Sequence, residues 1–308
     1  MGTYLVTGGA GFIGSHLTAA LASRGHAVRV VDNLTTGLVG NVPAKADFIE
    51  GDLTDPATAA DAVRDVEVVL HQAAVASVPL SITQPRISHE SNIDATFNVL
   101  LAARAAGVRR VVFAASSAVY GNSPALPKVE DMPTESLSPY ALQKQVGETY
   151  GRLFFEQFGL ETVSTRYFNV FGPRQHPTSP YSGVLSLFIS AALSGTAPTI
   201  YGDGEQTRDF IYIDNVVDGV LRAIDAPDAA GQVINIAAGE RVSLNQAWTA
   251  LEEILGPLPV PIYSPPRDGD VRHSQADISK AKHLLGYQPH VPFVEGLRQT
   301  VEWARTKP

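Results

Sequence analysis

The stretch that decides the fold is Tyr4-Leu5-Val6-Thr7-Gly8-Gly9-Ala10-Gly11-Phe12-Ile13-Gly14. A short apolar run that meets glycines and then a helical pattern indicates a strand, a tight turn and a helix. Gly8 permits the turn, Gly11 lets a pyrophosphate approach the backbone, and Gly14 lets the helix pack closely on the strand. The first turn of such a helix presents free N–H groups to an anion. The stretch therefore predicts an α/β sheet, and its glycines suit either a dinucleotide site or a purely structural turn.

Short β-rich runs alternate with helical stretches along the rest of the chain. We expect strands at Tyr4–Thr7, Val28–Asp32, Phe48–Glu50, Val66–His71, Val111–Ala115, Thr162–Tyr167, Phe210–Ile213 and Gln232–Ile236. We expect helices at Ile13–Ser23, Ile93–Ala106, Pro139–Phe158, Val184–Ser194, Asp214–Asp225, Leu244–Leu255, Ser279–Leu285 and Phe293–Thr306. Strand–helix alternation predicts a parallel sheet with right-handed crossovers.

This pattern predicts an α/β protein with a doubly wound (Rossmann) parallel sheet and a smaller C-terminal α/β substrate-binding domain. The sheet domain is expected to comprise residues 1–172, with a return segment near 209–240. The smaller domain is expected to comprise residues 173–208 and 241–308.

The amino-acid composition excludes several classes of site and disfavours one class of partner. The chain has 308 residues, 44% hydrophobic and 18% charged, which is enough apolar material for a large core. It has no cysteine, which excludes disulfide scaffolds, zinc–thiolate sites, iron–sulfur clusters and cysteine nucleophiles. A formal net charge of −8 disfavours nucleic acid as a partner, so an anionic ligand must be bound by helix N-termini and a few placed arginines.

Membrane and metal signals are also lacking in the sequence. No apolar stretch approaches the roughly 18 residues of a membrane helix, and no signal-peptide pattern is present at the N-terminus. We expect a cytoplasmic protein without a membrane partner. The eight histidines show no metal-ligand spacing, so no metal is expected.

A carboxylate at the end of the second strand points to the type of dinucleotide. Asp32 lies 24 residues after Gly8, where it can accept hydrogen bonds from the adenosine ribose and repel a 2′-phosphate. This favours NAD over NADP. Asp32-Asn33 would also suit a plain strand-ending turn, and Gly51-Asp52-Leu53 either borders the adenine or forms an ordinary turn.

A tyrosine and a lysine share one face of the helix Pro139–Phe158. Tyr140 and Lys144 are four residues apart, a spacing that also arises by chance, but the pair follows the fifth strand, where a doubly wound sheet forms its site. A phenol has an ordinary pKa of about 10, and a cation about 6 Å away lowers that pKa by about 2. With Lys144 and an oxidised nicotinamide beside it, Tyr140 would take the proton of a substrate hydroxyl. Ser116 would hydrogen-bond that hydroxyl, although Ser116 and Ser117 would also suit strand-end capping.

Four motifs together resemble the extended short-chain dehydrogenase/reductase superfamily, and within it the NAD-dependent UDP-sugar 4-epimerases. They are Thr7-Gly8-x-x-Gly11-x-x-Gly14, Ser116-Ser117-Ala118-Val119-Tyr120-Gly121, Tyr140-x-x-x-Lys144 and Arg166-Tyr167-Phe168-Asn169-Val170-Phe171-Gly172. The resemblance implies bound NAD and catalysis by Ser116, Tyr140 and Lys144. It implies cofactor contacts at Gly8, Gly11, Phe12, Ile13, Gly14, Asp32, Asn33, Asp52, Leu53, Gln72, Ala73, Ala74, Asn92, Tyr140, Lys144 and Phe168.

The same resemblance implies a UDP-hexose substrate. Its expected contacts are Ser77, Ser116, Ser117, Tyr140, Asn169, Val184, Leu185, Ile200, Tyr201, Arg208, Arg267, Asp270 and Ser274. Arg208 beside Asp209 would alternatively form a surface ion pair, and Ser77 would alternatively cap a helix. Related dehydratases and decarboxylases carry acidic residues directly after the catalytic hydroxyl residue, where this chain has Ser117 and Ala118. Elimination would therefore lack its proton acceptor, and 4-epimerisation remains.

Substrate range and assembly rest on the resemblance as well. Members restricted to plain hexoses can carry a tyrosine where this chain has Ser274, so Ser274 implies room for UDP-GlcNAc and UDP-GalNAc as well as UDP-Glc and UDP-Gal. A UDP-uronate 4-epimerase, a nucleotide-sugar reductase and a non-catalytic NAD-binding scaffold are the alternatives. The resemblance also implies a homodimer through helices 92–106 and 139–158, whose apolar faces would equally suit the core of one chain.

Overall fold

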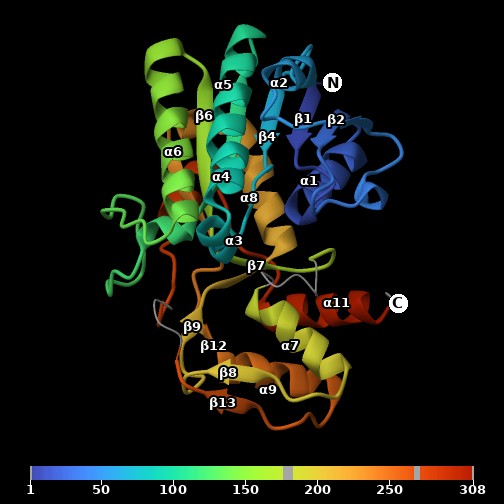
Figure 1. Ribbon diagram of the computed structural model, residues 1–308, viewed down its shortest axis with the longest axis vertical. Helices are drawn as coiled ribbons and strands as arrows, with labels where there is room; N and C mark the ends of the chain where they lie inside the picture. Colours follow the sequence, from blue (N-terminus) through green and yellow to red (C-terminus); the bar gives the residue numbers. More distant parts are fainter. Residues whose placement is uncertain (1, 176–182, 267–270, 307–308) are drawn as a thin grey trace.

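The computed structural model describes residues 2–175, 183–266 and 271–306. A seven-stranded sheet, in the order β11-β6-β5-β4-β1-β2-β3, forms the larger unit (Figure 1). Its strands are β1 (Thr3–Thr7), β2 (Ala27–Asp32), β3 (Asp47–Glu50), β4 (Val68–His71), β5 (Arg110–Ser116), β6 (Glu161–Tyr167) and β11 (Val233–Ile236). All neighbouring strands are parallel, which confirms the predicted doubly wound sheet.

Helices cover both faces of this sheet. They and the helices of the smaller unit are α1 (Phe12–Ser23), α2 (Pro56–Ala62), α3 (Val78–Thr83), α4 (Pro85–His89), α5 (Ala95–Ala105), α6 (Pro139–Phe158), α7 (Val184–Leu193), α8 (Ile213–Asp225), α9 (Leu244–Leu255), α10 (Ser279–Leu285) and α11 (Phe293–Arg305). The short turns are η1 (Val39–Asn41), η2 (Glu90–Asp94), η3 (Ser117–Tyr120) and η4 (Pro227–Ala229), and η2 is a π turn.

Neighbouring residues of the strands face opposite layers. Val6 and Leu70 pack in one apolar cluster with residues of α1 and α8. Leu5 and Val69 pack in a second cluster with residues of α2, α5 and α6. Strands that are buried on both faces need nearly continuous apolar sequence, which explains the runs of valine and leucine in β1 and β4.

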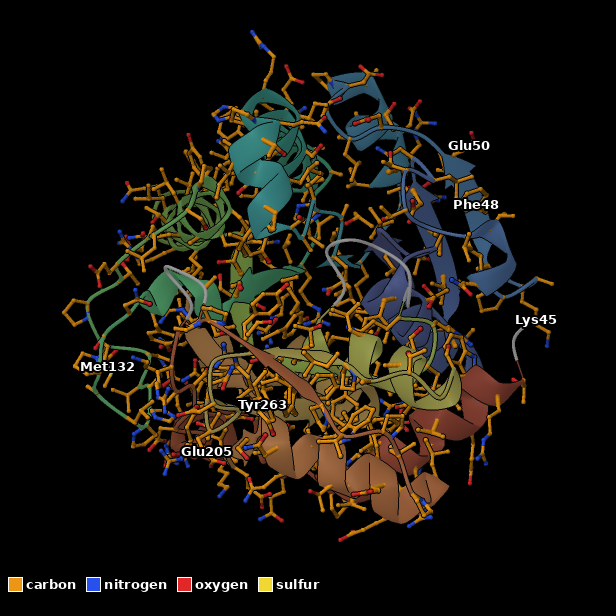
Figure 2. The ribbon with its side chains drawn as sticks, turned by 60° about the horizontal axis from the view of Figure 1, so that its bottom comes forward. Lys45, Phe48, Glu50, Met132, Glu205 and Tyr263 are labelled. Carbon is orange, nitrogen blue, oxygen red and sulfur yellow. The ribbon has the colours of Figure 1, made fainter. Side chains whose placement is uncertain are left out.

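The smaller unit carries α7, α9, β8 (Thr199–Tyr201), β9 (Thr207–Arg208), β12 (Val242–Ser243) and β13 (Ile262–Ser264). It lies beyond the carboxyl ends of the strands of the large sheet (Figure 1). Its short ladders join β8 to β13 and β9 to β12. A third ladder joins β7 (Asn169–Phe171) to β10 (Phe210–Tyr212). Glu205 and Tyr263 lie close together on this unit (Figure 2). Both side chains hydrogen-bond Asn245. No helix of the described residues is long and apolar enough to cross a bilayer.

Most predicted elements are found within a residue or two of their expected bounds. The short helices α2 and α3 and the short strands β7, β8, β9 and β12 were not predicted, and three further predictions were incomplete. The strand expected from Val66 begins at Val68. The helix expected from Ile93 begins as α5 at Ala95, because Ile93 and Asp94 belong to the π turn η2, which follows α4. The proline-rich stretch 256–266 contains the three-residue strand β13. This strand pairs with β8, which is distant in the sequence.

Candidate active site

The glycine turn has the close approaches that its sequence predicts. Gly8 has a φ of +64°, and a Cβ there would lie 2.8 Å from the backbone of Ala73. A Cβ on Gly14 would lie 2.2 Å from the Gly8 carbonyl oxygen, so any side chain would separate the helix from the strand. Gly11 is the N-cap of α1, with Phe12 and Ile13 in its first turn. The free N–H groups of this turn suit a pyrophosphate.

Asp32 at the end of β2 borders this turn. Its Oδ2 accepts a hydrogen bond from the Ala10 N–H at 3.0 Å, and its Oδ1 accepts one from the Leu34 N–H at 2.9 Å. Each carboxylate oxygen retains a lone pair for a ribose hydroxyl. Asn33 Nδ2 donates to Asp52 at 3.0 Å, which brings these two predicted cofactor residues together at the same edge.

Hydrogen bonds hold the segment after β4 against β1. Thr7 Oγ1 accepts from the N–H groups of Gln72 and Ala73, each at 3.1 Å, and therefore donates its own proton to His71 Nδ1 at 2.7 Å. Nε2 of His71 must then carry the ring proton, which it donates to Thr96 Oγ1 at 3.0 Å. Burial lowers the pKa of His71 to about 3, so the imidazole is neutral.

Gln72 and Arg174 each carry a buried nitrogen that no described group accepts from. Gln72 Oε1 accepts from the Tyr167 hydroxyl at 3.1 Å, which leaves its Nε2 unsatisfied. Nη1 of Arg174 is likewise unsatisfied, and burial lowers the pKa of Arg174. Arg174 lies near α1, because the preceding Pro173 carbonyl accepts from His16 Nε2 at 2.9 Å. A buried nitrogen without a hydrogen-bond acceptor is costly, so both nitrogens fit a site that a dinucleotide completes.

Arg174 was absent from the predicted site. Its signal in the sequence is its place two residues after Gly172, at the end of the fourth motif. That position alone does not show that its Nη1 atom is buried near α1.

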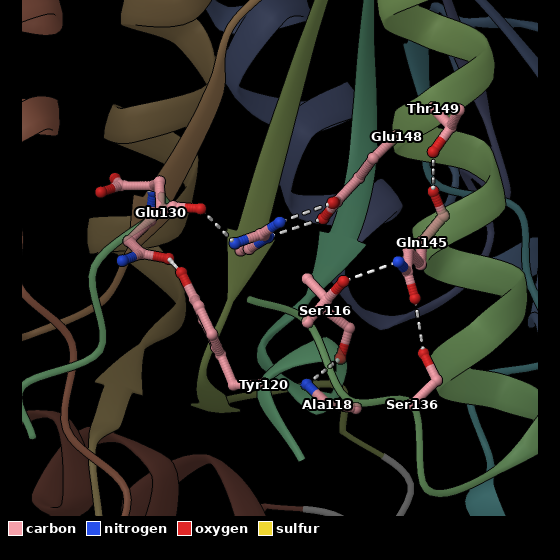
Figure 3. Close-up of polar contacts among 11 residues, drawn as sticks. Ser116, Ala118, Tyr120, Glu130, Ser136, Gln145, Glu148 and Thr149 are labelled. Carbon is pink, nitrogen blue, oxygen red and sulfur yellow. Dashed lines mark hydrogen bonds and ion pairs between the residues drawn. The ribbon is translucent and has the colours of Figure 1, made fainter. Parts of the chain in front are cut away.

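The three predicted catalytic residues converge at the carboxyl end of β5. Ser116 ends β5, and its Oγ caps η3 by accepting from the Ala118 N–H at 3.2 Å (Figure 3). Tyr140 lies in the first turn of α6, where its backbone N–H donates to Ser81 Oγ at 3.1 Å. Lys144 Nζ donates to the Ala114 carbonyl at 2.8 Å and lies 6.0 Å from the centre of the Tyr140 ring.

Burial changes the electrostatics predicted for this group. The pKa of Tyr140 is raised by burial, and the interaction with the Ser116 hydroxyl opposes that effect. The prediction that Lys144 and an oxidised nicotinamide together lower the pKa of Tyr140 stays a prediction. Lys144 is itself buried, which lowers its pKa to about 8, and the Glu148 carboxylate acts in the opposite direction. The two side chains are close enough to interact, but both lose the solvent that stabilises their charged forms.

A buried ion pair lies behind this group. Glu148 on α6 accepts from Nε and Nη2 of Arg166 on β6, each at 2.8 Å. Nη1 of Arg166 donates to the Glu130 carbonyl at 3.1 Å, so Arg166 bridges Glu148 and Glu130 (Figure 3). The pair joins the catalytic helix to the sheet.

Asn92 and Phe168 occupy buried positions near the same end of the sheet. Both N–H groups of Asn92 are used within the protein, by the Val75 carbonyl and Gln143 Oε1. Phe168 packs against Tyr120 with the ring centres 6.2 Å apart. Leu53 lies in the core, while Ala74 follows the β4 segment. Direct cofactor contacts by these residues stay predictions.

Three of the predicted substrate residues line one small cavity. Asn169, Val184 and Leu185 surround a space of about 30 Å³ between β7 and the start of α7. Leu185 and Ile200 are both buried in the core, so their side chains serve packing. Tyr201 is about one-third exposed, at 37%.

The strand β9 brings further predicted substrate residues together. Arg208 ends β9, and the Ser274 N–H donates to the Thr207 carbonyl at 3.1 Å. Asp209 is fully buried and accepts from the N–H groups of Ala238, Gly239 and Ala276, so its carboxylate serves the backbone. The predicted residues Arg267 and Asp270 lie outside the described residues.

Two predicted serines have structural contacts. Ser77 caps α3 by accepting from the Leu80 N–H at 3.1 Å, which matches the alternative named for it. Ser117 begins η3 directly after Ser116. Among the described residues, no three histidine, aspartate or glutamate side chains gather as metal ligands.

Comparison with known proteins places this geometry in a family. The model of the "NAD dependent epimerase/dehydratase family" matches residues 4–237. The chain belongs to this family. The chain is similar to a UDP-glucose 4-epimerase of Mycolicibacterium smegmatis, with 39% identity over 310 residues that cover 98% of both chains.

Two solved structures of family members are similar over nearly the whole length. A UDP-glucose 4-epimerase of Thermotoga maritima with UDP-glucose has a TM-score of 0.95 and 38% identity, covering 98% of both chains. A UDP-N-acetylglucosamine 4-epimerase of Methanobrevibacter ruminantium, in complex with UDP-N-acetylmuramic acid, has a TM-score of 0.95 and 39% identity, covering 99% of this chain and 98% of that one. NAD is the cofactor of this family. The glycine turn, the Asp32 carboxylate and the unsatisfied nitrogens of Gln72 and Arg174 would suit it, and their contacts with NAD stay predictions.

Proposed function

We propose that the chain is an NAD-dependent UDP-hexose 4-epimerase that acts through a transient 4-keto sugar. The observation that carries the proposal is the convergence of Ser116, Tyr140 and Lys144 at the carboxyl end of β5, the same edge of the sheet at which the glycine turn follows β1 two strands away. Relatives that match the whole length and carry the name UDP-glucose 4-epimerase support the same reaction.

The residues divide the work as follows. Bound NAD would supply the hydride acceptor of the oxidation and the hydride donor of the reduction that follows on the opposite face of the sugar. Tyr140 takes the proton of the 4-hydroxyl and returns it, and Ser116 hydrogen-bonds the same oxygen. Lys144 places a cation 6.0 Å from the phenol ring, which favours the phenolate that burial alone disfavours.

The positions that follow the catalytic serine support epimerisation over elimination. Ser117 and Ala118 carry no carboxylate to remove a proton from carbon 5, so the keto sugar has no built-in base for losing water. Turning the keto sugar over requires a firmly held nucleotide, for which Asn169 and Arg208 are the proposed diphosphate contacts.

We extend the proposal to N-acetylated hexoses. Ser274 is a small side chain beside β9, so an acetamido group would meet no bulky neighbour from this position. The solved relative named as a UDP-N-acetylglucosamine 4-epimerase supports this range.

We also propose a homodimer through α5 and α6. These helices lie side by side on one face of the sheet (Figure 1), joined by Phe97 against Tyr150 and Phe154. Leu101, Leu142, Leu153 and Phe158 are nevertheless exposed on them. Exposed apolar side chains on neighbouring helices would be buried if a second copy of the chain packed against them.

The variant Tyr140→Phe tests the proposed reaction. It should lower kcat by about 100- to 10,000-fold, because a phenyl ring can neither take nor return the proton. NAD should stay bound, as measured in the supernatant of the denatured protein. Tyr150→Phe on the same helix is the control and should retain activity.

Substrates are assayed separately without added reductant: UDP-glucose, UDP-GlcNAc and UDP-glucuronate. Inverted products from the first two support the proposal. Turnover of UDP-glucuronate alone would instead identify a uronate epimerase. Full activity in Tyr140→Phe would overturn the assigned base, and failure to convert UDP-GlcNAc would overturn the broader substrate range.

A further inference from the structure

We propose that Gln143 is a positioning residue for the epimerase reaction: its side-chain oxygen holds the catalytic helix α6 in register with the segment after β4 that forms the floor of the cofactor site. This proposal rests on the proposed function for its kinetic effect. The hydrogen bonds that carry it are independent of any substrate.

Gln143 lies beside Lys144 on α6 and is almost fully buried, with 4% of its surface exposed. Its Oε1 accepts two hydrogen bonds, from Ser88 Oγ at 2.7 Å and from Asn92 Nδ2 at 2.7 Å. Both donors come from the segment formed by α4 and the π turn η2. One oxygen atom therefore satisfies two buried donors, which would be costly to leave unpaired.

Asn92 joins Gln143 to the segment after β4, at Val75. Its Oδ1 accepts from the Val75 N–H at 2.7 Å, and its Nδ2 donates to the Val75 carbonyl at 3.1 Å. Val75 follows Gln72 and Ala73, whose backbone atoms lie close to Gly8 of the glycine turn, with Ala74 in between. Asn92 is thus clamped to both polar groups of one peptide position, and Gln143 is the contact that joins this clamp to α6.

The other hydrogen bonds of the catalytic helix lead elsewhere. The Tyr140 N–H bonds Ser81 on α3, and Lys144 Nζ bonds the Ala114 carbonyl on β5. Without Gln143, α6 would keep these contacts but lose its polar link to the segment after β4. Hydride and proton transfer require donor and acceptor to be aligned, and a misplacement of about 1 Å costs about 100-fold in rate.

The test compares Gln143→Leu, Gln143→Glu and a matched control, Gln145→Leu, in the holoenzyme. Gln145 lies on the same helix and also has two side-chain hydrogen bonds, with Ser136 and Thr134, but these join α6 to a loop. Gln143→Leu should lower kcat for UDP-glucose by about 10- to 100-fold, with KM changed less than about twofold. Gln143→Glu keeps the acceptor oxygen and should restore most of kcat. Gln145→Leu should stay within about twofold of wild type in both constants.

A second measurement does not depend on turnover. Hydrogen exchange of the Val75 amide should accelerate in Gln143→Leu and stay slow in Gln143→Glu and Gln145→Leu. The proposal is overturned if Val75 exchange is unchanged in Gln143→Leu, or if kcat falls equally in Gln143→Leu and Gln145→Leu. A wild-type protein that does not epimerise UDP-glucose would refute the proposed function, while the exchange result would still decide the role of Gln143.

Discussion

At the residue scale, burial disfavours the charged forms that the proposed reaction requires of Tyr140 and Lys144. Tyr140 must lose a proton in surroundings that raise its pKa, and Lys144 must keep one in surroundings that lower its pKa to about 8. Each side chain favours the other's charged form, although burial disfavours both charged forms separately. Ser116 and Glu148 act in the same favourable direction, through the hydroxyl and the carboxylate respectively.

Stability at alkaline pH tests the burial of Lys144. Its pKa falls from 10.5 in an unfolded chain to about 8 in the folded protein. Between these values the unfolded state binds the extra proton, so the free energy of unfolding should rise with pH, by about 3 kcal/mol for this residue. Urea unfolding of wild type and Lys144→Met at pH 7 to 10.5 isolates this contribution as the difference between the two proteins. A difference that does not change with pH would contradict the lowered pKa.

At the element scale, α6 organises the site. It carries Tyr140, Gln143, Lys144 and Glu148, and these contact α3, the π turn η2, β5 and β6 respectively. Its N-terminus is capped by Ser138, and Gly159, with a φ of +72°, ends it. Because α6 contacts four other elements through these side chains, the position of α6 relative to them determines the catalytic geometry.

The ion pair between α6 and β6 gives an element-scale prediction. Glu148→Gln should destabilise the protein by about 3–5 kcal/mol, because it leaves the buried Arg166 cation without its anion. Glu156→Gln is the control, since Glu156 pairs with Arg152 on the exposed face of the same helix. That variant should change the free energy of unfolding by at most about 1 kcal/mol. Urea denaturation of both variants gives the measurement, and equal losses would show that burial of the pair does not matter.

At the scale of the whole molecule, the two units divide the proposed binding tasks. The sheet provides the glycine turn and the catalytic group, and the smaller unit provides β9 with Arg208 and the neighbouring Ser274. The chain passes between the units more than once, because β11 returns to the sheet beside β6 before β12 and β13 form. Such crossings tie the nucleotide-binding elements to the sheet that carries the catalytic residues.

The proposed dimer is tested at this scale. Wild type should sediment with the mass of two chains, and Leu101→Glu combined with Leu153→Glu should sediment as one chain, because the charges would be buried without partners. Leu187→Glu is the control: Leu187 is also exposed, but it lies on α7 of the smaller unit. A wild-type mass of one chain, or an unchanged dimer in the double variant, would refute this interface.

The sequence alone was enough to predict the elements whose start, end or turn depends on residues close together in the chain. The strand–glycine–helix start, Asp32 at the end of β2, and α6 from Pro139 to Phe158 could all be predicted. Each depends on nearby residues: a turn that only glycine allows, a helix period, a cap. The spacing of Tyr140 and Lys144 likewise follows from one turn of helix.

Tertiary structure alone decided what depends on distant neighbours. The short strands β8 and β13 exist only as each other's partners, and Leu185 and Ile200 belong to the core because other elements enclose them. The direction of the Tyr140 pKa, the unsatisfied Arg174 nitrogen and the contact of Gln143 with Asn92 also require the folded chain. Solvent exclusion and long-range hydrogen bonds arise when separate segments meet, and no single segment encodes them.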